Sequence, residues 1–147
     1  MKAKRLKATD AETTWVLVFD KGDEVMKTLT AFAKEHDVSA AHFTAIGAFS
    51  EVRLGYFQRD KKDYKEIPVH EQVEVLSLIG DIALEKAEPK VHAHTVLGAA
   101  DGSTRGGHLL EAKVWPTLEV VLTRSPKHLR KKVDPDVGLA LIDLDAA

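Results

Sequence analysis

Short apolar segments with a two-residue alternation recur along nearly the whole chain, and only one segment shows the periodicity of an amphipathic helix. That helix is expected within residues 22–38, where Val25, Leu29 and Phe32 are apolar at helical spacing. Strands are expected at 14–20, 42–49, 51–57, 71–84, 90–97, 107–115, 117–123 and 137–144. The pattern predicts an α+β domain with one main helix on a largely antiparallel sheet.

Several of the expected strands are apolar on both faces. The segments "EVLSLI" (74–79) and "LEVVLT" (118–123) place large aliphatic side chains on either side of the backbone. One helix cannot cover both faces of so large a sheet. We therefore expect a curled, mixed sheet whose remaining apolar surface is covered by further copies of the chain.

Composition and charge limit the class of protein. The 147 residues are 44% hydrophobic and 30% charged, which fits one compact soluble domain, expected over residues 12–145 after an N-terminal tail at 1–11. The net charge of −2 creates no global positive field for nucleic acid or anionic lipid. Without cysteine, disulfides and Cys-ligated zinc are excluded. No apolar run approaches the ~20 residues of a membrane span, so we expect a cytoplasmic protein without a membrane partner.

Three of the seven histidines flank a turn in "KVHAHTVLGAADGSTRGGHLLEAKV" (90–114). His92 and His94 point to the same side of a strand, because side chains alternate between its faces. The pair Asp101-Gly102 favours a tight turn, and a turn centred on residue 101 would place His94 opposite His108. All three imidazoles would then share one face, whereas a register with an odd sum would put His108 on the other.

Three imidazoles that converge from adjacent strands form a ligand set for tetrahedral zinc with an open fourth position. Imidazole also suits nickel, copper and iron, so zinc is one candidate among the transition metals. Leu110, Ala112 and Val114 follow on the face of His108, which would set the site against apolar surface. The alternative is a structural role, with the histidines satisfied by hydrogen bonds to backbone or carboxylate groups.

The order of these motifs resembles the plant and prokaryote conserved (PPC) domain family. The matching segments, which extend over about residues 12 to 144, are His92-x-His94, "GGHL" at 106–109, "TLEV" at 117–120, "VEVLSLIGDIA" at 73–83, "AIGAF" at 45–49 and the closing "VGLALIDL". The resemblance implies a mixed α/β domain on antiparallel sheet that assembles as a homotrimer. It also implies a metal site in some members, which would map onto His92, His94 and His108.

For function, the resemblance implies a stand-alone PPC protein that binds DNA or associates with transcription. In plants the domain follows AT-hook segments, and the Arg-Gly-Arg-Pro hook, which reaches into the minor groove, is absent from this sequence. The strongest basic cluster lies in "TRSPKHLRKK" (123–132), where a trimer would triple the charge. The candidate DNA contacts are Arg124, Lys127, Arg130, Lys131 and Lys132.

Two other functions would use the same features. A zinc-dependent, hydrolase-like enzyme would need a general base near a metal-bound water, and Glu119 is the candidate. Glu111 should point away from His108 unless a bulge intervenes. An oligomeric ligand-binding or scaffold module would use the trimer without catalysis. Because no nucleophile elbow, phosphate loop or dinucleotide fingerprint is present, a non-enzymatic role is favoured.

Overall fold

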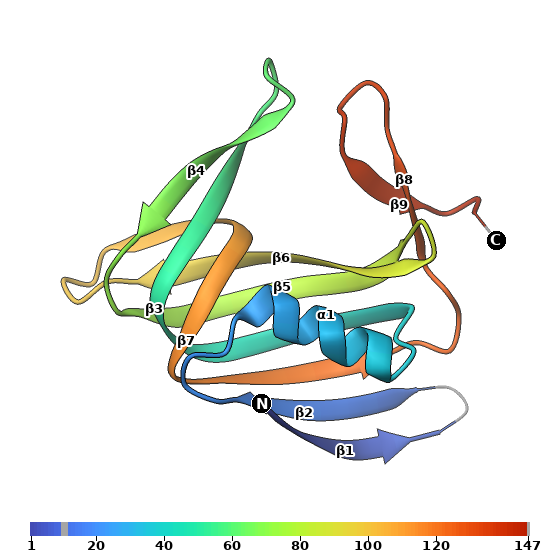
Figure 1. Ribbon diagram of the computed structural model, residues 1–147, viewed down its shortest axis with the longest axis horizontal. Coiled ribbons are helices and arrows are strands. Elements are labelled where there is room, and N and C mark those ends of the chain that lie inside the picture. Colours follow the sequence, from blue (N-terminus) through green and yellow to red (C-terminus); the bar gives the residue numbers. More distant parts are fainter. Residues whose placement is uncertain (10–11, 147) are drawn as a thin grey trace.

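The computed structural model describes residues 1–9 and 12–146, which form one compact domain that is mostly sheet with a single short helix (Figure 1). In chain order the elements are β1 (Lys2–Ala8), β2 (Thr13–Phe19), α1 (Val25–Glu35), β3 (Ala40–Gln58), β4 (Asp63–Val69), β5 (Val73–Glu85), β6 (Glu88–Gly98), β7 (Thr104–Arg124), β8 (Arg130–Val133) and β9 (Ala140–Asp143). The predicted α+β class with one main helix agrees with this arrangement.

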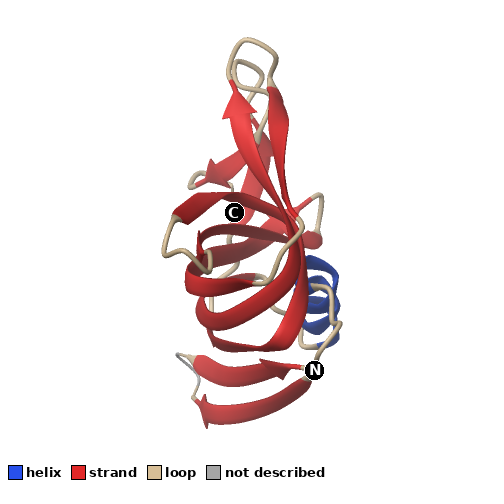
Figure 2. Ribbon diagram, turned by 90° about the vertical axis from the view of Figure 1, so that its left-hand side faces the viewer, coloured by secondary structure: helices blue, strands red, loops and turns tan. Residues whose placement is uncertain are grey.

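The sheet closes on itself through β7. This strand pairs with β2, with β3 and, through its first residues, with β6, while β5 joins β3 to β6. The circuit β3–β5–β6–β7 is therefore continuous, and Figure 2 shows the strands curling around the core. Every strand pairing is antiparallel except a short parallel contact of β8 with β5, so the expected curled and mixed sheet is confirmed.

Helix α1 covers one face of the sheet (Figures 1 and 2). Its apolar stripe of Val25, Leu29, Phe32 and Ala33 is buried, and the ring of Phe32 meets that of Trp15 on β2 edge-to-face at 5.6 Å. Burial of such side chains stabilises the fold by about 1.5–3 kcal/mol each. The helix is eleven residues long, and no helix in the described part of the chain is long and apolar enough to cross a bilayer.

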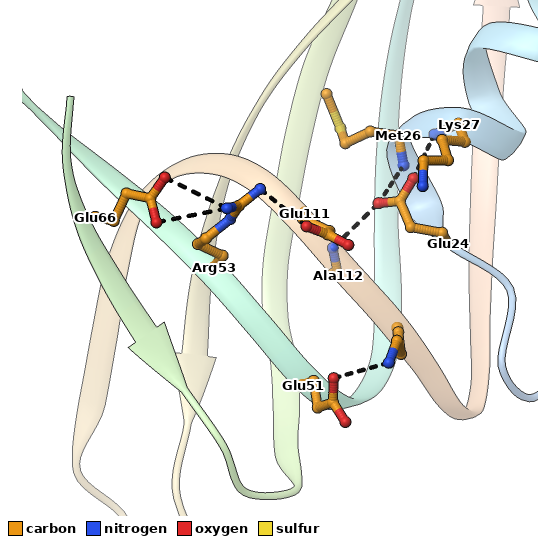
Figure 3. A network of polar contacts seen from close by, with 9 residues as sticks. Glu24, Met26, Lys27, Glu51, Arg53, Glu66, Glu111 and Ala112 are labelled. Carbon is orange, nitrogen blue, oxygen red and sulfur yellow. Dashed lines mark hydrogen bonds and ion pairs between the residues drawn. The ribbon is translucent and has the colours of Figure 1, made fainter. Parts of the chain in front are cut away.

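Glu24 ties the start of α1 to the sheet (Figure 3). Its carboxylate accepts hydrogen bonds from the amides of Met26 at 3.2 Å and Lys27, two of the groups that a helix N-terminus leaves without intrahelical partners. The same carboxylate accepts the amide of Ala112 on β7 at 3.2 Å. One side chain therefore both caps the helix and holds it against the strand that carries His108.

Two pairs of predicted strands are single long strands. The segments at 42–49 and 51–57 both belong to β3, and those at 107–115 and 117–123 both belong to β7. Pro116, which has no amide hydrogen to donate, lies where the pairing of β7 with β3 shifts register. Gly47 faces this bend with a φ of +152°, and a Cβ there would collide with the carbonyl of Thr117.

Three strands lie outside the predicted set. Residues 2–8, placed in the expected N-terminal tail, form β1 and pair with β2, with Lys2 opposite Val18. The other two, β4 and β8, are short and mostly polar. Exposed strands of this kind carry charges that protect a sheet edge, so they lack the alternation that marks a half-buried strand.

The face of the sheet opposite α1 carries the histidines at one end. Cross-strand partners lie on the same face, so the pairings define two adjacent rows across it. The first row is Thr14, Thr123, His42, Asp81 and His92, and the second is Val16, Val121, Thr44, Ile79, His94 and His108. We call the exposed aliphatic residues Val18, Ile46, Ile79, Val96 and Val121 on this side the uncovered apolar face.

Candidate metal centre

The histidine hairpin has the predicted register. His94 lies directly opposite His108, and His92 lies two residues before His94 on the same face of β6. The turn is held by Asp101, whose side chain accepts the amide of Ser103 at 2.9 Å, and by Gly102 with a φ of +80°. Local turn chemistry therefore decides that the three imidazoles share one face.

The three imidazoles lie at the corners of a nearly equilateral triangle. The ring centroids are separated by 5.1 Å for His92 and His94, 5.1 Å for His92 and His108, and 5.3 Å for His94 and His108. One nitrogen from each ring lies within 4.8 Å of the others. The Nε2 atoms of His92 and His94 are 3.2 Å apart. Two nitrogens on one tetrahedral zinc at ~2.0–2.1 Å would be about 3.3 Å apart, so this spacing fits a shared metal.

Asp81 orients His92. Oδ2 of Asp81 lies 3.1 Å from Nδ1 of His92, and the ammonium of Lys131 forms an ion pair with Oδ1 at 2.7 Å. Burial raises the pKa of Asp81, but the hydrogen bond from His92 and the charge of Lys131 outweigh it, so the net pKa is lowered. An ionised Asp81 accepts the Nδ1 proton of His92, which leaves Nε2 with a free lone pair toward His94.

His108 is held neutral by its surroundings. The ring of Tyr64 stacks on it at 4.6 Å and 22°, and its Nδ1 atom is buried without a hydrogen-bond partner among the described residues. The pKa of His108 falls from 6.5 to about 4, with burial as the largest cause, followed by the charges of His92, His94, Lys131 and Lys90. Burial also lowers the pKa of His94. Neutral imidazole is the form that binds a metal.

Acidification should destabilise the metal-free protein as the pH falls from 6.5 to about 4. Below pH 6.5 the unfolded chain protonates His108 while the folded protein does not, so protons favour the unfolded state. Above that pH both states hold the group neutral and its contribution is constant. Urea denaturation across this interval measures the effect. The non-titrating His108→Gln variant is expected to lose less stability than the wild type, and equal losses would contradict the assignment.

The two carboxylates considered as general bases lie away from the histidines or are already paired. Glu119 is opposite Ile46 on β3, and along the sheet two further strands, β5 and β6, lead from Ile46 to His94. Glu111 was expected to point away from His108 unless a bulge lay between them. The pairing of β7 with β3 does shift register between these two residues, and Glu111 lies opposite Arg53. The guanidinium of Arg53 binds Glu111 at 2.9 Å and also reaches Glu66 (Figure 3).

The five basic residues near the C-terminus differ in their exposure and in their partners. Lys131 has a side chain only 4% exposed and is paired with Asp81. Arg124 donates a hydrogen bond to the carbonyl of His36 at 3.3 Å, and Nε of Arg130 is buried. Of this set, Lys127 and Lys132 are exposed.

Three features of the site were not predicted: the roles of Asp81 and Tyr64, and the contact that Lys131 makes with the site. Asp81 carried one signal, because it is the lone carboxylate within the apolar run "LSLIGDIAL" (76–84). A charged side chain in such a run needs a partner. Tyr64 lies on β4, which was not predicted, so its stacking on His108 had no signal in the sequence.

The chain is therefore a small domain with a closed mixed sheet and one helix. It carries a candidate metal centre, in which a His-x-His pair lies beside a third histidine. Residues 6–126 match the model of the Plants and Prokaryotes Conserved (PCC) domain. The chain belongs to this family, which confirms the resemblance seen in the motifs.

Three solved structures resemble the whole chain. The PPC protein of Pyrococcus horikoshii is 31% identical, with a TM-score of 0.85 and coverage of 99% of this chain and 97% of that one. A metal-containing protein of Archaeoglobus fulgidus is 33% identical, with a TM-score of 0.82 and coverage of 88% and 91%. A candidate DNA-binding protein of Bacteroides thetaiotaomicron is 27% identical, with a TM-score of 0.90 and coverage of 98% and 99%.

One curated relative is much longer than this chain. The bifunctional protein GlmU of Synechococcus sp. is 28% identical over 120 residues, which covers 80% of this chain. The match spans 18% of GlmU, so the similarity concerns a part of that protein.

Proposed function

We propose that this chain is a metal-binding PPC protein in which His92, His94 and His108 hold one zinc ion or another divalent transition metal. The observation that carries the proposal is the pair of Nε2 atoms 3.2 Å apart on His92 and His94, with His108 completing the triangle. Asp81 supplies the carboxylate that commonly orients a metal-binding histidine. The name of the Archaeoglobus fulgidus relative, a metal-containing protein, supports the same function.

Elemental analysis of the purified, untagged protein tests the proposal. About one transition-metal ion per chain is expected, either as isolated or after incubation with a small excess of zinc and removal of free metal. A protein that stays metal-free after this incubation would overturn the proposal and leave the histidines with a structural role.

Asp81→Asn should weaken zinc binding by about 10- to 100-fold, the usual cost of losing the partner that orients a metal-binding histidine. Asparagine keeps the shape but removes the charge that favours the Nδ1 tautomer of His92. Competition with a chromophoric chelator measures the affinity. Asp60→Asn, at an exposed turn residue, is the matched control and should bind zinc as the wild type does. Equal affinities for the two variants would remove Asp81 from the site.

We further propose that the chain assembles as a homotrimer through the uncovered apolar face. In the single chain Ile46 and Ile79 are 63% and 57% exposed, although they lie in the middle of a wide sheet. Large exposed aliphatic side chains grouped on one face of a sheet are typical of a subunit interface. His94 lies in the same cross-strand row as Ile79, so the metal centre would lie at the edge of the interface.

DNA association is a second candidate function, favoured by the name of the Bacteroides thetaiotaomicron relative. In a trimer the exposed Lys127 and Lys132 would each occur three times, which suits non-specific contact with phosphates. We expect a labelled duplex to bind at 50 mM salt and to be released largely by 200 mM salt. A Lys127→Gln/Lys132→Gln double variant should show a shallower salt dependence. Absence of binding at 50 mM salt would contradict this function.

The geometry favours binding over catalysis at the metal centre. A hydrolase-like reaction would need a general base within hydrogen-bond reach of a metal-bound water. Along the sheet, β3 and β5 lie between Glu119 and His94, and Glu111 is paired with Arg53. Asp81 is engaged by His92 and Lys131.

A further inference from the structure

A pocket of about 390 Å³ opens beside the histidine cluster. His92 and His108 line it together with side chains from two hairpins that rise from the same side of the sheet (Figure 1). The β3–β4 hairpin contributes Tyr64, and the β8–β9 hairpin contributes Val133 and residues 138–141. The two hairpins also touch each other, because the ammonium of Lys62 donates to a carbonyl of the C-terminal hairpin at 3.0 Å.

The walls of this pocket are mainly aliphatic. The aliphatic lining residues are Val91, Leu110, Val133, Leu139, Ala140 and Leu141. Its volume lies within the range of ~300–1,000 Å³ that small-molecule sites occupy. Aliphatic side chains contribute nothing to the binding of a hydrated ion. The lining therefore fits the apolar body of a small organic molecule.

The two lysines that line the pocket favour an anion. Lys90 and Lys131 line it, as does Glu85. Lys131 forms an ion pair with Asp81 at 2.7 Å. Lys90 forms a longer ion pair with Glu85 at 3.9 Å, so its N–H groups make no hydrogen bond to that carboxylate and can donate to a ligand. Both lysines act on the histidine cluster, since their charges contribute to the lowered pKa of His108. A bound metal dication would add positive charge and an open coordination position at the same place.

We propose that this pocket binds a small organic carboxylate, a proposal that rests on the proposed metal site. The carboxylate ligates the metal and meets the ammonium of Lys90, while the apolar body of the ligand packs against Leu110, Leu139 and Leu141. A phosphate group would call for several converging donors, whereas the pocket offers one ammonium, that of Lys90, whose only ion pair among the described residues is a long one.

The test uses the full chain loaded with cobalt(II), whose visible spectrum reports a change of ligands, and three probes. The probes are 4-methylpentanoate, its neutral amide 4-methylpentanamide, and acetate. We expect 4-methylpentanoate to alter the cobalt spectrum and to bind at least tenfold more tightly than the amide, which lacks the charge. It should also bind at least tenfold more tightly than acetate, which lacks the apolar body.

Two variants test the charged part and the aliphatic part of the pocket one at a time. Lys90→Met should weaken 4-methylpentanoate at least tenfold with little effect on the amide, because methionine keeps the length of the side chain and removes its charge. Leu141→Ser should weaken both. Lys4→Met, on the exposed strand β1, is the matched control and should bind all probes as the wild type does. Cobalt stoichiometry should be unchanged in all three variants, since none replaces a histidine.

The outcomes distinguish the pocket from the metal site. If cobalt binds at about one ion per chain but the acid and the amide bind equally, or Lys90→Met binds the acid as tightly as the wild type, the carboxylate proposal is wrong and the metal site stands. If the wild type binds neither cobalt nor zinc, the metal site is wrong and the carboxylate proposal is overturned with it.

Discussion

Alanine in place of His92, His94 or His108 is expected to lower the bound metal from about one ion per chain to less than a tenth of that value. Each imidazole supplies one of only three protein ligands, so each loss removes a full metal–nitrogen bond. We expect the zinc affinity to fall by at least 100-fold, more than for loss of the orienting carboxylate. Elemental analysis after gel filtration measures the stoichiometry, and chelator competition measures the affinity.

The control for these variants is a histidine outside the cluster. His36 lies at the end of α1 against Phe32, with the two ring centroids 4.4 Å apart, and His70 is an exposed residue between β4 and β5. Both His36→Ala and His70→Ala should retain the full metal content. Circular dichroism would verify that every variant is folded. Full stoichiometry in the three cluster variants would refute the metal centre.

Ile79→Asp should convert the proposed trimer to a monomer. The side chain is 57% exposed in the single chain, so the charge remains in water when the monomer folds. In the assembled protein it would be buried among the aliphatic side chains of the uncovered apolar face, where an unpaired carboxylate is costly to desolvate. Light scattering coupled to gel filtration gives the mass. We expect three times the chain mass for the wild type and one chain mass for the variant.

Leu144→Asp provides the matched control for this experiment. Leu144 is 87% exposed and lies near the C-terminus, outside the uncovered apolar face, so its replacement should leave the trimer intact. Monomeric Ile79→Asp should still bind metal, because one chain supplies all three histidines. A wild-type monomer, or a trimeric Ile79→Asp variant, would show that this face does not hold the assembly together.

The elements that the sequence predicted well depend on local patterns. Apolar spacing placed the helix within 22–38, and α1 spans Val25–Glu35. The turn chemistry of Asp101-Gly102 predicted that His94 faces His108. Both inferences hold because neighbouring residues decide them: a helix repeats every 3.6 residues, and a short hairpin turn sets the register of its two strands.

The approach of Asp81 to His92 could not be predicted in the same way. The two residues belong to the β5–β6 hairpin, whose register is unbroken from its turn up to this pair. The turn is Lys86-Ala87, with φ values of 50° and 67°. Glycine, asparagine and aspartate are the residues that mark such a turn in a sequence, and Lys-Ala is not typical of it, so the register of this hairpin had no signal in the sequence.

The single helix, most of the strands and the hairpin that unites three histidines follow from local sequence patterns, because spacing and turn residues act over a few positions. The surroundings of those histidines depend instead on how distant strands pack together. This packing paired Lys131, an expected DNA contact, with Asp81, and it stacked Tyr64 on His108. These contacts join β4 to β7 and β8 to β5, and non-local pairings of this kind are settled by the packing of the whole sheet.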